Sequence, residues 1–168
     1  LGYPGGPQID RLAAEGEAGE IRFPRPMLKK DTLNFSFSGV KTAVLNFIHK
    51  EPCLPQGERL KAVATAFQDA VVDVLTQKTL RAARQEGLQR IVVAGGVACN
   101  SRLRQHFVDC SVREGVEVFF PSPVLCRDDG PMLGVAGDYY LSKGGCSSLD
   151  MNAVSSWPLE EVRCDRLG

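Results

Sequence analysis

The amino-acid sequence predicts an α/β fold, with a short parallel sheet and flanking helices. Short apolar runs rich in β-branched residues, at 91–94 and 116–120, are typical of buried strands. Segments with apolar residues at three- and four-residue spacing lie before, between and after these runs, and that spacing indicates amphipathic helices. Strands interleaved with helices favour a parallel sheet.

The first part of the chain is expected to hold two helices and an extended segment. Turn chemistry at residues 1–7 precedes a short helix over 8–15. Prolines and charges predict a loop or edge strand over 17–26. Alternation of Leu and Phe with Asn and Ser predicts a strand over 33–38, and a helix over 39–50 follows it.

The second part of the chain is expected to be mostly helical. A linker at 51–57 leads to the clearest element, a long helix or two joined ones over 58–86 with one apolar stripe. A helix over 99–114 is predicted between the two strands, and a closing helix over 129–143 follows a Pro-Ser-Pro turn. The tail, 145–168, is predicted to be irregular.

Composition limits the function classes. With 168 residues the chain is one ordinary domain or half of something larger, and its opening without Met suggests a fragment. It has 43% hydrophobic residues, and 20 Lys and Arg balance 20 Asp and Glu, so disorder is excluded and any nucleic-acid contact must be local or carried by another chain. Six scattered cysteines without a CxxC pair, and no apolar run of about 18 residues, favour a reduced, cytoplasmic protein without a membrane span.

A glycine turn follows the strand at 91–94. Gly95 and Gly96 let the backbone approach a ligand closely, and Asn100 or Ser101 is placed to cap the next helix. The carboxyl end of a strand beside a helix N-terminus is the usual place for an anionic ligand in an α/β sheet. A nucleotide is therefore one interpretation, and a strand-to-helix turn without a ligand is the other.

The segment Gly-Gly-Pro-Gln-Ile-Asp at the start of the first helix is a second candidate. Its glycine backbone suits contact with a ligand, and Asp10 suits a hydrogen bond from a ribose hydroxyl. The alternative is that Asp10 only stabilises the helix as an acidic residue in the first turn.

Other candidates are weaker on sequence alone. Residues 36–42 lack the spacing of a phosphate-binding loop, so Ser38 is expected to cap a helix and Lys41 either to contact an anion or RNA or to be solvated. Asp128 suits one metal ligand, although capping by Asp128 and Asp129 also fits. The two histidines, His49 and His106, belong to no metalloprotease or nucleophile pattern.

The ordered motifs GYPGGPQID, FPRPM, NFSFSGVKT, AFQDAVVDVL, VVAGGVACNSRLR and CRDDG are similar to the carboxy-terminal half of the tRNA N6-adenosine threonylcarbamoyltransferase (TsaD) family. The resemblance covers residues 1–157. It implies a ribonuclease H-like lobe of the actin-like ATPase superfamily, within a two-lobed fold. It also implies transfer of a threonylcarbamoyl group from threonylcarbamoyl-adenylate to N6 of adenosine 37, in tRNAs that read codons beginning with A.

The resemblance also implies site residues. Gly6, Asp10 and Asn100 match positions that bind the adenylate or an adenine nucleotide, and Gly95 and Gly96 match the same wall. Asp128 matches the carboxylate ligand of a divalent metal, iron or zinc, whose two histidines are expected outside this chain.

The sequence departs from the family pattern at four positions. Arg127 and Asp129 stand where Thr and Asn are usual, and Pro131 replaces a commoner Ala, which puts the placement of the metal carboxylate in doubt. Cys99 stands where a small residue is usual, and this change is expected to be tolerated.

Partners follow from the resemblance as well. They are tRNA, a smaller paralogous subunit (TsaB-type) and an ATPase subunit (TsaE-type), with Lys29, Lys30 and Lys41 as a local patch for tRNA or a solvated surface. The chain alone is expected to be inactive. The competing interpretations are a non-catalytic paralogous scaffold subunit and the metallo-glycoprotease activity once assigned to this family.

Overall fold

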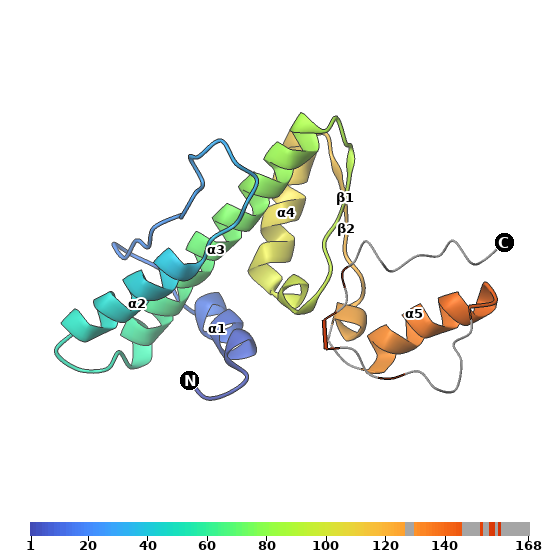
Figure 1. Cartoon of the computed structure of the whole chain (residues 1–168). Helices are drawn as coiled ribbons and strands as arrows, with labels where there is room; N and C mark the ends of the chain where they lie inside the picture. Colours follow the sequence, from blue (N-terminus) through green and yellow to red (C-terminus); the bar gives the residue numbers. More distant parts are fainter. Residues whose placement is uncertain (127–129, 146–151, 153–154, 157, 159–168) are drawn as a thin grey trace. The chain divides into compact units, whose positions relative to one another are not determined.

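The computed structural model describes residues 1–126, 130–145, 152, 155–156 and 158, and divides the chain into two compact units. The first unit is Leu1–Cys126 and the second is Arg127–Gly168. The first unit is an α/β arrangement with a two-stranded parallel sheet and flanking helices, as the sequence predicts (Figure 1).

A single long helix organises the first unit. This helix, α3 (Gly57–Gln85), is continuous over 29 residues, which settles the prediction of one helix or two joined ones. It packs against α1 (Gly5–Ala14), α2 (Ser38–Lys50) and α4 (Ser101–Glu114) (Figure 1). Three buried clusters lie along this helix, and each joins it to segments far away in the sequence.

The sheet consists of β1 (Arg90–Val92) and β2 (Glu117–Phe119), which pair in parallel with Ile91 opposite Val118. The two strands are shorter than predicted, and within residues 1–126 only one face of the sheet is covered. Ile91 is 8% exposed and packs against α3 and α4, whereas Val92 on the other face is 71% exposed. Within residues 1–126 helices cover only the Ile91 side, so the expectation of a buried strand does not hold for the Val92 face of this unit.

The predicted strand at 33–38 is wrong. Residues 32–37 have no regular secondary structure, and two of their backbone carbonyls bind a side chain. Lys78 of α3 donates from Nζ to the carbonyl oxygens of Thr32 and Asn34, at 2.6 Å each. The alternating pattern at 33–38 does not indicate this contact, because Lys78 lies 44 positions after Asn34 in the sequence.

Helix starts also differ from prediction. The first helix begins at Gly5 rather than near Gln8, and Pro7 fits there because the first N–H groups of a helix have no partner within it. Asp10 consequently lies in the second turn, so the first-turn electrostatic interpretation does not apply. Between β1 and α4 lies a separate 3-10 turn, η1 (Gly96–Cys99), which moves the start of α4 to Ser101.

The chain after β2 continues with a short 3-10 turn, η2 (Pro123–Cys126), still within the first unit. The second unit contains α5 (Gly130–Ser142), which matches the predicted closing helix. Most of the predicted irregular tail, 145–168, and the cap expected at Asp129 lie outside the described residues.

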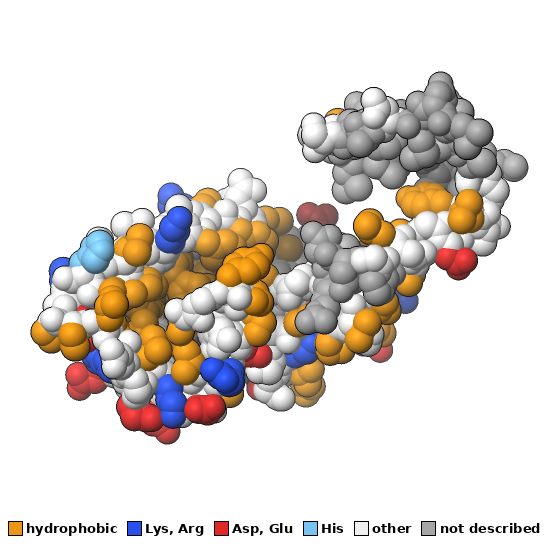
Figure 2. All heavy atoms as spheres, turned by 90° about the horizontal axis from the view of Figure 1, so that it is seen from below, with side chains coloured by type: hydrophobic (Ala, Val, Ile, Leu, Met, Phe, Trp, Pro, Cys, Tyr) orange, Lys and Arg blue, Asp and Glu red, His pale blue; other side chains and the backbone are white. Residues whose placement is uncertain are grey.

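Surface charge and hydropathy agree with the balanced composition. In the part of the chain that the structure describes, no helix is long and apolar enough to cross a membrane. Away from the grey residues, the face shown in Figure 2 carries acidic and basic side chains interspersed rather than grouped by sign. This face therefore gives no support to a broad basic surface.

Candidate functional site

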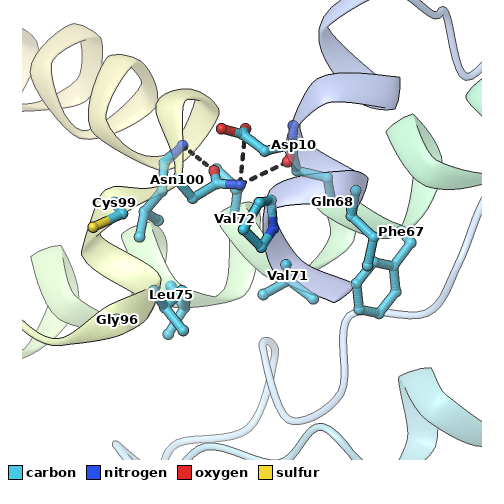
Figure 3. A pocket seen from close by; sticks show the side chains of 14 residues that line it. Asp10, Phe67, Gln68, Val71, Val72, Leu75, Gly96, Cys99 and Asn100 are labelled. Atoms are coloured by element: carbon cyan, nitrogen blue, oxygen red, sulfur yellow. Dashed lines mark hydrogen bonds between the residues drawn. The ribbon is translucent and has the colours of Figure 1, made fainter. Parts of the chain in front are cut away.

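A cavity of about 440 Å³ lies between α1, α3, η1 and the start of α4 (Figure 3). This volume is in the range of small-molecule pockets in proteins, about 300 to 1,000 Å³. The cavity is lined by Gly6, Pro7, Ile9, Asp10, Phe67, Gln68, Val71, Val72, Leu75, Gly96, Val97, Cys99, Asn100 and Leu103.

One wall of the cavity is apolar. Helix α3 supplies Phe67, Val71, Val72 and Leu75, which follow the three- and four-residue spacing of one helix face. An apolar wall of this kind favours a flat, weakly hydrated ligand surface, since contact removes both surfaces from water.

Asn100 is the centre of the polar side of the cavity. Its Oδ1 accepts a 2.8 Å hydrogen bond from the backbone N–H of Leu103, so it caps α4 as predicted. Its Nδ2 donates to Asp10 Oδ1 at 3.0 Å and to Gln68 Oε1 at 2.7 Å (Figure 3). One side chain thus connects the start of α4 to both α1 and α3.

Asp10 binds the start of α4 through three hydrogen bonds. Oδ2 accepts from the backbone N–H of Ser101 at 3.1 Å, and Oδ1 accepts from the Ser101 hydroxyl at 2.9 Å and from Asn100. A carboxylate is favourable at this place because a helix N-terminus carries partial positive charge. Oδ2 keeps one acceptor position for a further donor, since a carboxylate oxygen accepts about two hydrogen bonds.

The structure brings together three site residues that lie far apart in the sequence. Gly6, Asp10 and Asn100 all line the same cavity, although Asp10 and Asn100 are separated by 90 positions. Gly96 lines the cavity too, whereas Gly95 is not among the lining residues. A Cβ at Gly6 or Gly96 would have no neighbouring atom within 4 Å. Steric crowding therefore does not require glycine at either position.

Gln68 is a cavity residue that the sequence analysis did not single out. It is 6% exposed and lies on the apolar face of α3, four residues before Val72 and four after Ala64. A polar residue inside an apolar stripe was the available signal, because a buried amide needs hydrogen-bond partners.

The phosphate-loop-like segment contributes no cap. Helix α2 begins at Ser38 itself, with Phe37 as the preceding residue and no side-chain cap, so the expected capping by Ser38 was wrong. The Ser38 hydroxyl lies instead 3.2 Å from the Ser36 hydroxyl, and Lys41 is exposed. Nothing in this segment lines the cavity.

The predicted metal ligand, Asp128, lies outside the described residues. Within residues 1–126 and 130–145, no three His, Cys, Asp or Glu side chains are grouped closely enough to hold a metal ion. The described residues therefore do not form a metal centre by themselves, and the metal site stays a prediction.

A histidine near a cysteine occurs on α4, away from the cavity. His106 Nε2 lies 3.9 Å from Cys110 Sγ and 3.9 Å from Asp73 Oδ1, while Nδ1 is buried without a partner among the described residues. A nucleophile-histidine-carboxylate triad needs the two partners on different ring nitrogens. This group does not have that geometry.

Comparison with known proteins identifies the family. The family model of TsaD, tRNA N6-adenosine threonylcarbamoyltransferase, matches residues 1–135. The chain belongs to this family.

Two similar TsaD proteins show the extent of the match. A tRNA N6-adenosine threonylcarbamoyltransferase from Syntrophotalea carbinolica is 59% identical over 96% of this chain and 47% of the relative. One from Geobacter metallireducens is 52% identical over 97% of this chain and 48% of the relative. The chain therefore spans about half the length of the curated relatives it matches.

A solved structure shares the fold of this TsaD family chain. The crystal structure of T. kodakarensis HypF aligns with a TM-score of 0.55 over 84% of this chain and 18% of that chain. Sequence identity is 19%, so the likeness concerns the fold alone.

Proposed function

We propose that this chain takes part in tRNA modification as an acyltransferase. The reaction is transfer of a threonylcarbamoyl group from threonylcarbamoyl-adenylate to N6 of adenosine 37, in tRNAs that read codons beginning with A. Family membership over residues 1–135 supports this reaction. We further propose that residues 1–168 do not complete it alone, since they match about half of the relatives' length.

Within this reaction, we assign the chain to binding of the adenylate. The observation that carries the assignment is the meeting of Gly6, Asp10 and Asn100 on one cavity, from motifs at opposite ends of the first unit's sequence. The parallel sheet, the helices on it and the fold likeness to HypF support a ribonuclease H-like lobe of the actin-like ATPase superfamily.

The cavity suits the nucleoside part of an adenylate. The α3 wall supplies apolar contact for a base, and the free acceptor position on Asp10 Oδ2 suits a ribose hydroxyl. Gly6 and Gly96 leave open space in the cavity lining, where a side chain would otherwise compete with the ligand.

The metal and the partners are part of the same proposal. Asp128 would hold a divalent metal, iron or zinc, with histidines outside residues 1–168. Such a metal supplies a Lewis acid that polarises an acyl or phosphoryl oxygen. The partners proposed are tRNA, a TsaB-type paralogous subunit and a TsaE-type ATPase subunit.

The assignment is tested by AMP binding and tRNA modification with the full-length protein. Gly6→Leu places a side chain in the cavity, and Gly5→Leu is the matched control because Gly5 does not line it. We expect Gly6→Leu to weaken AMP binding at least tenfold and to lower formation of the modified nucleoside, measured by mass spectrometry. Gly5→Leu should retain both.

Three results would count against the proposal. Equal losses in the two variants would show that the effect is not specific to the cavity. AMP binding without nucleoside modification, in the presence of the partner subunits and tRNA, would favour a scaffold subunit. Peptide cleavage without modification would favour the glycoprotease alternative.

A further inference from the structure

Gln68 is a buried amide in an otherwise apolar wall. It lies on α3 between Phe67 and Val71 and is 6% exposed. Its Oε1 accepts a hydrogen bond from Asn100, and a buried amide costs free energy unless its remaining donors and acceptors are used as well. Its hydrogen bonds therefore indicate what the cavity presents to a ligand.

The orientation of this amide follows from one backbone group. The N–H of Leu103 can only donate, so the Asn100 atom that faces it at 2.8 Å must be the carbonyl oxygen, Oδ1. The amide nitrogen of Asn100 then faces Gln68, so the Gln68 atom at 2.7 Å must be the acceptor, Oε1. The other atom of the Gln68 amide group is therefore the nitrogen, Nε2, which is a hydrogen-bond donor.

The donors of Asn100 are already used within the protein. Its amide group has two hydrogens, and they are directed to Asp10 Oδ1 and Gln68 Oε1. Gln68 Nε2, by contrast, has no hydrogen-bond partner among the residues that the structure describes. Of the two amide side chains that line the cavity, Gln68 is thus the one with donor capacity to spare.

We propose that Gln68 is a specificity-determining residue of this cavity, which donates from Nε2 to a ring nitrogen of a purine base. The inference rests on the proposed binding of an adenylate here. Its neighbours on the cavity wall, Phe67, Val71 and Leu75, are apolar and suit the faces of a flat ring. A donor in such surroundings discriminates strongly, because a ligand without an acceptor leaves it unpaired.

The experiment measures binding of AMP and of its 1-deaza, 3-deaza and 7-deaza analogues to the full-length protein. Each analogue replaces one ring nitrogen by C–H and keeps the shape of the base. With the wild-type protein, one analogue should bind about tenfold more weakly than AMP, the loss of one hydrogen bond to a buried donor.

The same series is then measured with Gln68→Glu and Gln68→Met. Glu retains an oxygen for Asn100 but lacks the donor, and Met lacks both while keeping an unbranched side chain. In these variants AMP itself should bind about tenfold more weakly, and the affected analogue should bind as well as AMP. Gln77→Glu, the same change at an exposed site of α3, is the control and should leave all ratios at wild-type values.

Two outcomes separate this inference from the proposed function. If AMP binds, Gly6→Leu weakens binding at least tenfold, and the analogue ratios are unchanged by both Gln68 substitutions, Gln68 does not contact the base and this inference fails alone. If the wild-type protein binds no AMP, both fail. Thermal unfolding of each variant shows whether it is folded. If the carboxylate of Gln68→Glu, which lies near that of Asp10, prevents folding, Gln68→Met still tests the inference.

Discussion

Two adjacent glycines in the turn after β1 have different structural reasons to be glycine. Gly95 has φ 91° and ψ 173°, a conformation that residues with a Cβ rarely adopt. Gly96 has an ordinary φ and open space around a built Cβ, and it lines the cavity. Backbone conformation therefore accounts for Gly95, and access to the cavity is the remaining reason for Gly96.

Alanine substitution should separate these two reasons. Gly95→Ala should lower the free energy of unfolding by about 1 to 3 kcal/mol, the cost of a strained backbone conformation. Gly96→Ala should change stability by less than about 1 kcal/mol but weaken AMP binding, because its methyl group enters the cavity rim. Urea denaturation and AMP titration measure the two effects. Equal destabilisation by both substitutions would contradict the distinction.

Residue chemistry explains which site residues were predictable. Gly6, Asp10 and Asn100 belong to glycine-rich or capping patterns that can be recognised locally in the sequence, although the structure places Gly6 and Asp10 within α1. Gln68 stands inside a regular helix, and its role depends on Asn100, 32 positions away. The contact of Asp10 with Ser101 was likewise absent from local sequence, because it depends on how α1 and α4 pack on α3.

At the scale of elements, the segment before α2 is held to α3 by cations that bind backbone carbonyls. Lys78 binds the carbonyls of Thr32 and Asn34, and Arg81 binds those of Leu28 and Lys30. They hold residues 28–34 against α3, whereas the strand predicted at 33–38 is absent. Periodicity gave the helices correctly because their apolar stripes are local, whereas strand pairing depends on a partner elsewhere in the chain.

Lys78 should make stability depend on pH. Its side chain is 1% exposed, and burial, followed by the nearby charge of Arg81, lowers the pKa of its ammonium group. Between this lowered pKa and the ordinary value of about 10.4, the unfolded chain binds more protons than the folded one. The free energy of unfolding that Lys78 contributes should therefore rise with pH through this window.

Comparison with Lys78→Met isolates that effect. Urea denaturation of both proteins at several pH values between about 7 and 10 should show a difference, wild type minus variant, that increases with pH. Contributions of other titrating groups are common to both proteins and cancel. A constant difference would show that Lys78 keeps an ordinary pKa in the folded protein. Lys41→Met, the same substitution at an exposed position of α2, is the control for replacing a lysine by Met.

At the scale of the molecule, one arginine connects the glycine turn to the segment that leads toward Asp128. Arg104 of α4 donates from Nε to the Ala98 carbonyl at 2.6 Å and from Nη2 to the Pro121 carbonyl at 2.9 Å. Its guanidinium also lies over the ring of Phe120, at 4.9 Å from the centroid. The wall of the cavity and the exit of β2 are thereby held together within the first unit.

The fold class of the molecule was predictable from its sequence. The proposed metal ligand, Asp128, lies outside the residues that the structure describes. Two parallel strands that follow each other in the sequence need a crossover connection, and the alternation of strands and helices predicted one. Helix α4 provides this connection between β1 and β2. Asp128 entered only through the family motif, because a single carboxylate does not define a metal site.

Substitution of Asp128 in the full-length protein tests the metal ligand directly. Asp128→Ala should lower the metal content measured by elemental analysis and abolish tRNA modification, because an oxygen ligand of the divalent ion is lost. AMP binding should change by less than about threefold, since the nucleoside contacts proposed here come from α1, α3 and α4. Asp129→Ala, the adjacent carboxylate, is the matched control and should retain the metal. Wild-type metal content in Asp128→Ala, or equal loss in both variants, would refute the role of Asp128 as the ligand.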